Sequence, residues 1–250
     1  MTQPKHDRLD QILLARGLFS SRSRARDAIE RGTVRINGEV ITKPGQQVFP
    51  GVEITVDDPA RDYVSRAALK LASGLDHFRL DPEGRTCLDI GISTGGFAEI
   101  LLQRGAAHVI GIDVGHGQLH ARLKAEPRLT SFEGLNARDL DRSHLGGRKV
   151  DAIVSDVSFI SLKLALPPAL GLAEPGSFAL LLVKPQFEAG REAIGKNGLL
   201  KDPGLGPKIA EDLSAWLDQQ PGWKSVGTMA SPLTGGDGNR EYLLAGWKEQ

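Results

Sequence analysis

The sequence predicts an α/β protein, with a doubly wound, mostly parallel sheet that follows a small N-terminal α+β domain. Near-continuous apolar segments, typical of buried parallel strands, alternate with stretches that have helical periodicity. A glycine-rich turn, LDIGISTGG at 88–96, joins one such strand to a helix at 97–104. Near the N-terminus, Asn37-Gly38 separates two short alternating runs, which is the strongest local indication of a β-hairpin.

Composition limits the possible classes of protein. The 250 residues include 31 basic and 31 acidic side chains and are 40% hydrophobic, which is ordinary for a globular chain with one large core and a small module. Zero net charge means that any nucleic-acid contact must come from a local patch. The lone Cys87 lies in an apolar strand and is expected to be a core residue. Without a membrane-length apolar segment or a signal peptide, we expect no membrane association and a cytoplasmic protein.

The elements of the N-terminal module are predicted from the residues that begin and end helices. A short helix at 8–17 ends at Gly17, and a second helix at 21–31 starts at an N-cap serine and ends at Gly32. The hairpin follows, and 52–56 is a last strand. We place this domain at 1–58, a polar linker at 59–64 and a second domain at 65–250.

Arginine is concentrated in the second helix and the hairpin. Between residues 16 and 35 there are six arginines but only two acidic side chains, a local excess of four. This pattern is compatible with a solvated helix face or with phosphate binding. The candidate RNA-binding residues are Arg22, Arg24, Arg26, Arg31 and Arg35.

The module resembles the alpha-L RNA-binding domain first seen in a small-subunit ribosomal protein. The matching segments are RLDQILL, SRSRARDAIERGTVRING and VFPGVEITV, which together span most of 6–57. The resemblance implies that the arginine-bearing helix and the hairpin lie on structured RNA and read its shape and phosphates.

Strands and helices alternate through the second domain. A helix at 65–78 is expected to begin at Ser65 and to turn Leu69, Ala72 and Leu75 toward the sheet, with Lys70 beside that stripe. The other expected helices are 97–104, 118–125, 162–173 (interrupted by two prolines) and 206–219. The expected strands are 86–90, 109–114, 129–135, 151–157 and 178–184, followed by an antiparallel pair at 223–230 and 240–247.

The glycine-rich turn has three interpretations. A dinucleotide site would need glycine where Ser93 stands. A hydrolase nucleophile elbow matches the GISTG pattern, but no histidine follows His144 to complete a triad. The preferred interpretation is an S-adenosylmethionine loop, in which Asp89 at the strand end and Asp113 after the next strand hold the ligand's amino-acid group and ribose.

Four charged side chains end predicted strands: Asp89, Asp113, Asp156 and Lys184. In doubly wound sheets the ligand crevice lies beyond the carboxyl ends of the strands. These charges should therefore meet at one mouth, where they would alter one another's protonation.

The second domain resembles the haemolysin A (TlyA) family of ribosomal RNA methyltransferases. The segments that carry the resemblance are YVSRAALKL, LDIGISTGGF, GIDVGHGQL, SDVSFISL, LLVKPQFE and GGDGNREYL. The chain departs from the family at Ala67-Ala68, where two glycines are usual. The resemblance implies a seven-stranded Rossmann-like methyltransferase sheet, S-adenosylmethionine as cofactor, and a ribose 2′-hydroxyl of ribosomal RNA, of a cytidine, as the methyl acceptor.

By that resemblance Lys70, Asp156, Lys184 and Glu241 correspond to a catalytic Lys-Asp-Lys-Glu tetrad. A ribose 2′-hydroxyl is a poor nucleophile, so a positioned base must take its proton during attack on the methyl group. We expect Lys184 to be that base, activated by the neighbouring Lys70 and by partial burial. The two carboxylates would orient the amines and the hydroxyl.

The remaining site predictions concern ligand contacts. Gly91, Ser93 and Gly95 are expected to line the methionine end of the cofactor near Asp89, Asp113 to bind the ribose, and Asn136 to lie on the adenine side. Phe159 and Phe187 are equally compatible with stacking on a flipped nucleotide and with core packing. His116 and His120 lack a third ligand, so no metal site is expected.

Three other functions remain open on the sequence. SDVSF faintly resembles the motif of base N-methyltransferases but lacks its two prolines. The chain could also be an RNA-binding assembly factor without turnover. A pore-former, suggested by the family's older name, lacks a convincing membrane segment. The target nucleotide, the ribosomal subunit and the oligomeric state are not predicted.

Overall fold

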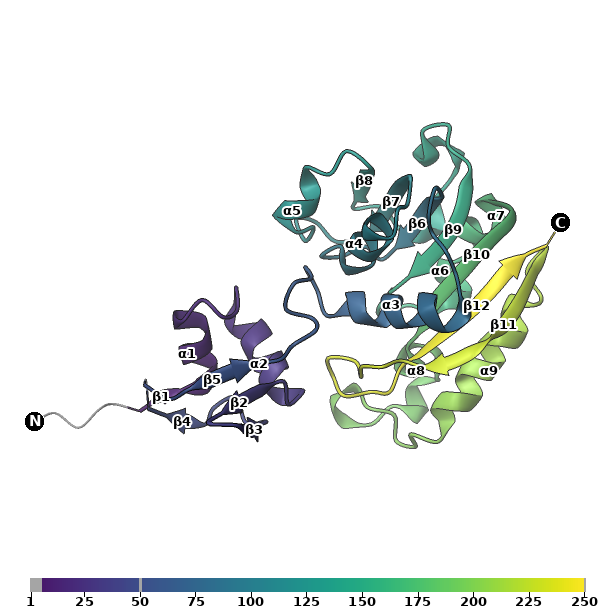
Figure 1. Ribbon diagram of the computed structural model, residues 1–250. Helices are drawn as coiled ribbons and strands as arrows, with labels where there is room; N and C mark the ends of the chain where they lie inside the picture. The colour runs from purple at the N-terminus through teal and green to yellow at the C-terminus, as the bar shows by residue number, and fades with distance from the viewer. Residues whose placement is uncertain (1–5, 50, 250) are drawn as a thin grey trace, which may run out of the picture. The chain divides into compact units, whose positions relative to one another are not determined.

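The computed structural model of the chain describes residues 6–49 and 51–249. The chain divides into two compact units, residues 1–62 (unit 1) and residues 63–250 (unit 2) (Figure 1). Each unit has its own hydrophobic core.

Unit 1 is an α+β module in which two helices pack on short antiparallel strands. Ser21 caps the second helix by accepting a hydrogen bond from the Arg24 N–H (3.3 Å). Asn37 and Gly38 both have positive φ and close the predicted hairpin. One further strand pair, β1 with β4, was not predicted, because two residues are too few to show a periodicity. The elements are β1 (Asp7–Arg8), α1 (Leu9–Ala15), α2 (Arg22–Glu30), β2 (Val34–Ile36), β3 (Glu39–Ile41), β4 (Gln47–Val48) and β5 (Ile54–Val56).

Unit 2 contains a seven-stranded sheet in the order β11-β12-β10-β9-β6-β7-β8. All neighbouring strands are parallel except at β12, which runs antiparallel to both β10 and β11. The predicted fold class and the predicted antiparallel end pair are therefore confirmed. The strands are β6 (Thr86–Ile90), β7 (His108–Asp113), β8 (Leu129–Glu133), β9 (Val150–Ser155), β10 (Ala173–Val183), β11 (Trp223–Ala230) and β12 (Tyr242–Lys248).

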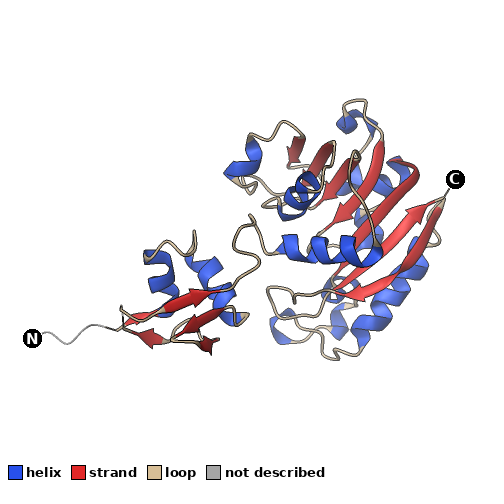
Figure 2. Cartoon of the chain, viewed as in Figure 1, coloured by secondary structure: helices blue, strands red, loops and turns tan. Residues whose placement is uncertain are grey.

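Helices cover both faces of this sheet (Figure 2). Alternate residues of each strand contribute to two separate cores, one beneath α3, α4 and α5 and the other beneath α6, α7 and α9. Cys87 belongs to the first core, and burial raises the pKa of its thiol to about 12, so it is the packing residue that was expected. The helices are α3 (Ala67–Phe78), α4 (Gly96–Gln103), α5 (Ala121–Lys124), α6 (Leu162–Ala165), α7 (Pro167–Leu172), α8 (Pro185–Glu188) and α9 (Leu205–Leu217).

The predicted sheet-facing stripe of α3 was partly wrong. The buried residues of this helix are Ala68, Lys70, Leu71, Gly74 and Leu75, whereas the Leu69 and Ala72 side chains are only partly covered. Gly74 explains why the helix faces the sheet with a different set of residues than predicted. A Cβ at this position would lie 2.8 Å from a Leu180 methyl carbon and 3.1 Å from one of Leu243. The helix thus approaches the sheet most closely at Gly74, and Lys70, one turn earlier, is carried onto the buried face.

The predicted helix at 118–125 was also too long, since α5 spans only Ala121–Lys124. Gln118 lies instead in the preceding loop, where its side-chain oxygen accepts a hydrogen bond from the Ser93 hydroxyl (2.9 Å). That loop borders the functional site.

Candidate active site

The carboxyl ends of the central strands surround a cavity of about 580 Å³. Asp113 is the last residue of β7, Asp156 directly follows β9, and Lys184 directly follows β10. All three line the cavity, as the sequence led us to expect for strand-end charges. The rest of the wall includes Ile90, Gly91, Ser93, Val114, Gly115, Gln118, Asn136, Val157, Ser158, Phe159 and Ile160.

The glycine-rich turn forms one wall of this cavity. Gly91 has a φ of +87°, and a Cβ there would lie 3.0 Å from the backbone oxygen of Asp156. Ser93 also has a positive φ, and its N–H donates to Asp113 Oδ2 (2.8 Å). The turn is thus closed tightly against the ends of β7 and β9, which only glycine permits at position 91.

We expect Gly91→Ala to weaken binding of the predicted cofactor by about tenfold or more. The new methyl group would have to displace the Asp156 backbone, and the alanine backbone would have to adopt a strained positive φ. Isothermal titration of S-adenosylmethionine measures this effect. Gly84→Ala is the matched control, because Gly84 also has a positive φ but its Cβ would meet no atom within 4 Å. Equal affinity of both variants would contradict the proposed role of the turn.

Asp113 and Asn136 both line the cavity with part of their hydrogen-bonding capacity already used. Asp113 Oδ1 accepts from the Gly115 N–H (2.7 Å), so backbone donors fix both of its oxygens. Asn136 Oδ1 accepts from the Arg138 N–H (3.0 Å) and begins a short 3₁₀ turn. Its side-chain amide N–H groups are the part that a ligand could use.

Asp89 lies deeper than we predicted. Its side chain is fully buried and is absent from the cavity wall. Burial raises the pKa of this carboxyl well above its usual range, and the nearby carboxylates of Asp156 and Asp113 raise it further. The backbone of Ala98 opposes this rise in the pKa, although neither side-chain oxygen has a hydrogen-bond partner of good geometry. A cation in the cavity would offset this concentration of acidic groups.

Gly95 does not line the cavity either. Its Cβ position would lie 2.3 Å from a Leu123 methyl carbon, and its φ is +94°. Gly95 therefore lets α5 pack closely against the start of α4, and its contact with a ligand stays a prediction.

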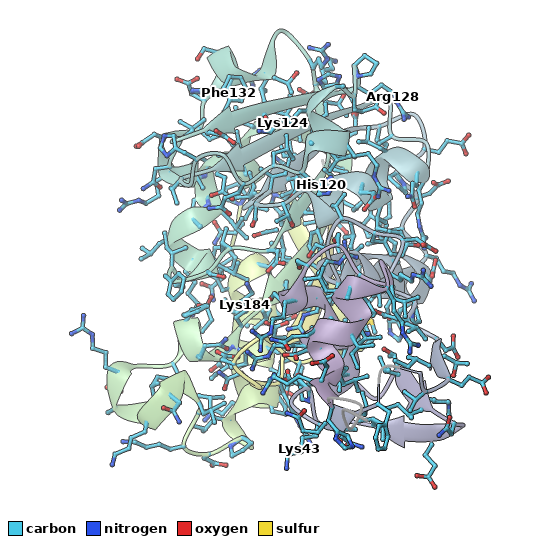
Figure 3. All side chains as sticks on the ribbon, turned by 90° about the vertical axis from the view of Figure 1, so that its left-hand side faces the viewer. Lys43, His120, Lys124, Arg128, Phe132 and Lys184 are labelled. Atoms are coloured by element: carbon cyan, nitrogen blue, oxygen red, sulfur yellow. The ribbon has the colours of Figure 1, made fainter. Side chains whose placement is uncertain are left out.

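Lys184 and Asp156 form an ion pair at the mouth of the cavity. The Lys184 Nζ lies 2.6 Å from Asp156 Oδ1, and it also donates a hydrogen bond to the Ser158 hydroxyl (2.8 Å). Lys184, labelled in Figure 3, directly precedes α8. Both side chains of the pair are largely covered, with 11% and 19% of their surface exposed.

Lys70 and Glu241 form a second, more deeply buried ion pair. Lys70 extends from α3, Glu241 stands just before β12, and both are at least 95% covered. Burial raises the pKa of the Glu241 carboxyl, against the opposing effect of Lys70; Lys184 also opposes the rise and Asp156 adds to it. The charges of Lys184 and Asp156 thus act on the Glu241 carboxyl. Lys70 and Glu241 do not line the cavity itself, and their membership of one tetrad with Asp156 and Lys184 stays a prediction.

Two aromatic rings lie beside the pair at Lys184. Phe159 and Phe187 have ring centroids 5.1 Å apart. Phe159 is 90% exposed, which excludes the core-packing interpretation for that side chain, and its φ of +65° is unusual for a bulky residue. The exposed ring is held where a planar group entering the mouth could meet it.

The predicted RNA-binding arginines of unit 1 fall into two sets. Arg31 donates to both oxygens of Asp58 (2.8 and 2.9 Å) and to Asp27 (2.9 Å), and its side chain is only 15% exposed. We therefore correct Arg31 from an RNA contact to a residue that ties α2 to the segment after β5. Pairing with Asp58, 27 positions away, was not visible in the sequence pattern.

Of the other four arginines, Arg22, Arg26 and Arg35 are exposed, whereas Arg24 is half-buried. Arg22 contacts the buried Asp10 (2.9 Å), and Arg24 donates to the Ala60 and Arg61 carbonyls, so both also support the fold. Arg26 and Arg35 are exposed, with weaker contacts to Glu30 (4.0 Å) and to the Gly38 carbonyl (3.2 Å).

The described residues contain neither a metal-ligand cluster nor a membrane-spanning helix. Among the residues that the structure describes, no cluster of three or more histidine, cysteine or carboxylate side chains could hold a metal ion. Within 6–49 and 51–249, no helix combines the length and apolar character needed to cross a bilayer.

Sequence reasoning missed two parts of the site. Ser158 lies inside the SDVSF segment, but nothing in the spacing indicated that its hydroxyl would reach Lys184. Glu188 accepts hydrogen bonds from the Ser161 hydroxyl (2.6 Å) and the Leu162 N–H (2.7 Å), contacts across 26 or more positions that no local pattern reveals.

Known proteins resemble both units of this chain. Residues 63–248 match the FtsJ-like methyltransferase family, and residues 7–54 match the S4 domain. The 16S/23S rRNA (cytidine-2′-O)-methyltransferase TlyA of Mycobacterium tuberculosis is 46% identical, over 95% of this chain and 88% of the relative.

Two further relatives carry a different name. Hemolysin A of Brachyspira hyodysenteriae is 39% identical, over 94% of this chain and 98% of its own. A solved structure of a hemolysin candidate from Streptococcus thermophilus superposes with a TM-score of 0.75 at 37% identity, over 99% of this chain and 90% of that one.

Proposed function

This chain belongs to the FtsJ-like methyltransferases and resembles TlyA along nearly its whole length, and on that premise we propose that it methylates a ribose 2′-hydroxyl, of a cytidine, in ribosomal RNA. The observation that supports the proposal is the Lys184–Asp156 ion pair at the mouth of the strand-end cavity, with the buried Lys70–Glu241 pair under the influence of both of its charges. Such a substrate would place its work in the cytoplasm.

S-adenosylmethionine is the cofactor that the residues fit. Gly91 lets the turn close against the Asp156 backbone at the edge of the cavity, and acidic groups surround this cavity, which is large enough for a nucleoside. When bound, this cofactor supplies an electrophilic methyl group on a positively charged sulfur. Gly91 and Ser93 would border its amino-acid end, Asp113 its ribose and Asn136 its adenine side.

The mouth residues would activate the acceptor. A ribose hydroxyl must lose its proton as its oxygen attacks the methyl carbon, and Lys184 in its neutral form can take that proton. Asp156 then stabilises the ammonium that forms. The buried Lys70–Glu241 pair would complete the tetrad that the family resemblance implies.

Phe159 gives the mouth a means of holding the target nucleotide. A ribose hydroxyl inside folded RNA reaches a recessed lysine only if its nucleotide leaves the stack, and an exposed ring can compensate for the lost stacking. Phe187 supports that ring from behind.

Unit 1 would bind the ribosomal RNA through its accessible arginines. We expect Arg26→Ala with Arg35→Ala to weaken RNA binding and to reduce the slope of log affinity against log salt by about 1–2. Arg31→Ala is the matched contrast and should instead lower the melting temperature, because its partner Asp58 loses its bidentate pair. Filter binding at several salt concentrations and thermal melting separate the two effects. An unchanged salt slope in the double variant would contradict the assignment.

The proposed function is tested by mapping ribose methyl groups on ribosomal RNA from cells with and without this protein. We expect at least one cytidine 2′-O-methyl group to disappear with the gene and to return with the wild-type chain but not with Lys184→Ala. An identical ribose map, with a methyl group lost from a base instead, would support N-methylation and reject the proposal.

A further inference from the structure

We propose that Ser158 is a positioning residue for methyl transfer, which fixes the direction in which the lone pair of the general base Lys184 points. This inference rests on the proposed function, because it assigns a task to a residue outside the four charged ones at the same mouth. Its basis is the hydrogen bond from Lys184 Nζ to Ser158 Oγ, at 2.8 Å.

A lysine that acts as a base has two N–H bonds and one lone pair, arranged tetrahedrally around nitrogen. Lys184 Nζ donates a hydrogen bond to Ser158 Oγ at 2.8 Å, whereas its 2.6 Å contact with Asp156 Oδ1 is an ion pair without hydrogen-bond geometry. Ser158 thus fixes the direction of one N–H group, and with the other drawn toward the Asp156 carboxylate the remaining direction belongs to the lone pair. With Asp156 alone, the amine could rotate about its terminal bond and point that lone pair elsewhere.

The loop that carries Ser158 is held in place independently of Lys184. Phe159 turns the chain through a positive φ directly after Ser158. The next residues are tied down by Glu188, which accepts from the Ser161 hydroxyl and the Leu162 N–H. Glu188 ends α8, the helix that begins directly after Lys184. Lys184 and Ser158 are thus connected through α8, through the Glu188 contacts with Ser161 and Leu162, and through the chain from Ser161 back to Ser158. These connections restrict the distance between the base and its acceptor.

An opposite arrangement is chemically possible and makes the opposite prediction. If the Ser158 hydroxyl donated to the lone pair of neutral Lys184, it would compete with the substrate for the base. Removing it would then raise the rate.

The test compares Ser158→Ala, Ser158→Thr and the wild-type chain in single-turnover methyl transfer, across a series of ribosomal-subunit concentrations at saturating S-adenosylmethionine. We expect Ser158→Ala to lower the rate plateau at saturating subunits by about 10-fold, a part of the 10²–10⁴-fold that a positioned base supplies. The subunit concentration that gives half of the plateau should be unchanged, because the orientation of the base and not the binding of RNA is altered. Ser158→Thr keeps the hydroxyl and should recover the rate to within about threefold.

Three further measurements make the result specific. Melting temperature and S-adenosylmethionine affinity should be unchanged by Ser158→Ala, since Lys184 keeps Asp156 and the loop keeps Glu188. Ser143→Ala is the matched control, because that exposed hydroxyl contacts only the adjacent Asp141 turn. A plateau equal to or above the wild-type value would overturn the inference. A wild-type chain that forms no 2′-O-methyl product in the same assay would instead reject the proposed function, and the role of Ser158 with it.

Discussion

Lys184→Ala should lower methyl transfer by about 10²–10⁴-fold, the contribution of a positioned general base. The nitrogen is the group at the mouth that can both accept the hydroxyl proton and be stabilised afterwards by Asp156 at 2.6 Å. Lys184→Arg should be nearly as inactive, because a guanidinium keeps the charge but does not lose its proton in proteins. Single-turnover transfer of a radiolabelled methyl group measures the effect.

The control for this experiment is Lys208→Ala, which removes an exposed lysine from α9 and should leave the rate unchanged. Lys184→Arg keeps a positive charge beside Asp156, so its melting temperature and cofactor affinity should remain close to those of the wild-type chain, whereas Lys184→Ala should lose part of the stability that the pair provides. Retained activity in Lys184→Arg would show that the positive charge, rather than proton acceptance, is what the reaction needs.

Breaking the buried Lys70–Glu241 pair should have the largest effect on stability. Glu241→Ala leaves the Lys70 ammonium without its partner in a site that is 95% covered, which costs about 3–5 kcal/mol of the free energy of unfolding. The same reasoning applies to Lys70→Ala, which strands the carboxylate. Equilibrium denaturation in urea measures the loss, provided that each variant unfolds in one step.

The double variant Lys70→Met with Glu241→Gln separates stability from chemistry. Both charges are removed together, so we expect most of the lost stability to return, while methyl transfer stays low. Arg104→Ala is the matched control: this residue pairs with Asp76 at 2.6 Å, but the partners are 32% and 67% exposed, so its loss should cost at most about 1 kcal/mol. A double variant with wild-type activity would show that the buried pair is structural only.

The sequence predicted the sheet well because its strands are long apolar runs and its turns contain glycine. The hairpin at Asn37-Gly38 and the loop at Gly91 both need residues with positive φ, and glycine and asparagine, which favour that conformation, can be recognised in the sequence. Strand ends in a parallel sheet share one edge, so the meeting of Asp113, Asp156 and Lys184 also followed from topology.

The sequence could not predict how deeply a side chain is buried or which distant residue it contacts. The face of α3 was misjudged because Gly74 allows an approach to Leu180 that no periodicity reveals. Asp89 looked like a ligand contact, but it stands one residue before the end of β6 and is covered. Arg31 was predicted to contact RNA, but in the structure it forms an ion pair with Asp58.

The site of the methyl group on the RNA tests the central claim most directly. Ribosomal subunits methylated by the purified chain with a radiolabelled cofactor would be digested with alkali, which cleaves after every ribose that has a free 2′-hydroxyl. We expect the label in alkali-resistant dinucleotides whose first nucleoside is cytidine. Label released in mononucleotides, on the base, would contradict transfer to ribose and the role proposed for Lys184.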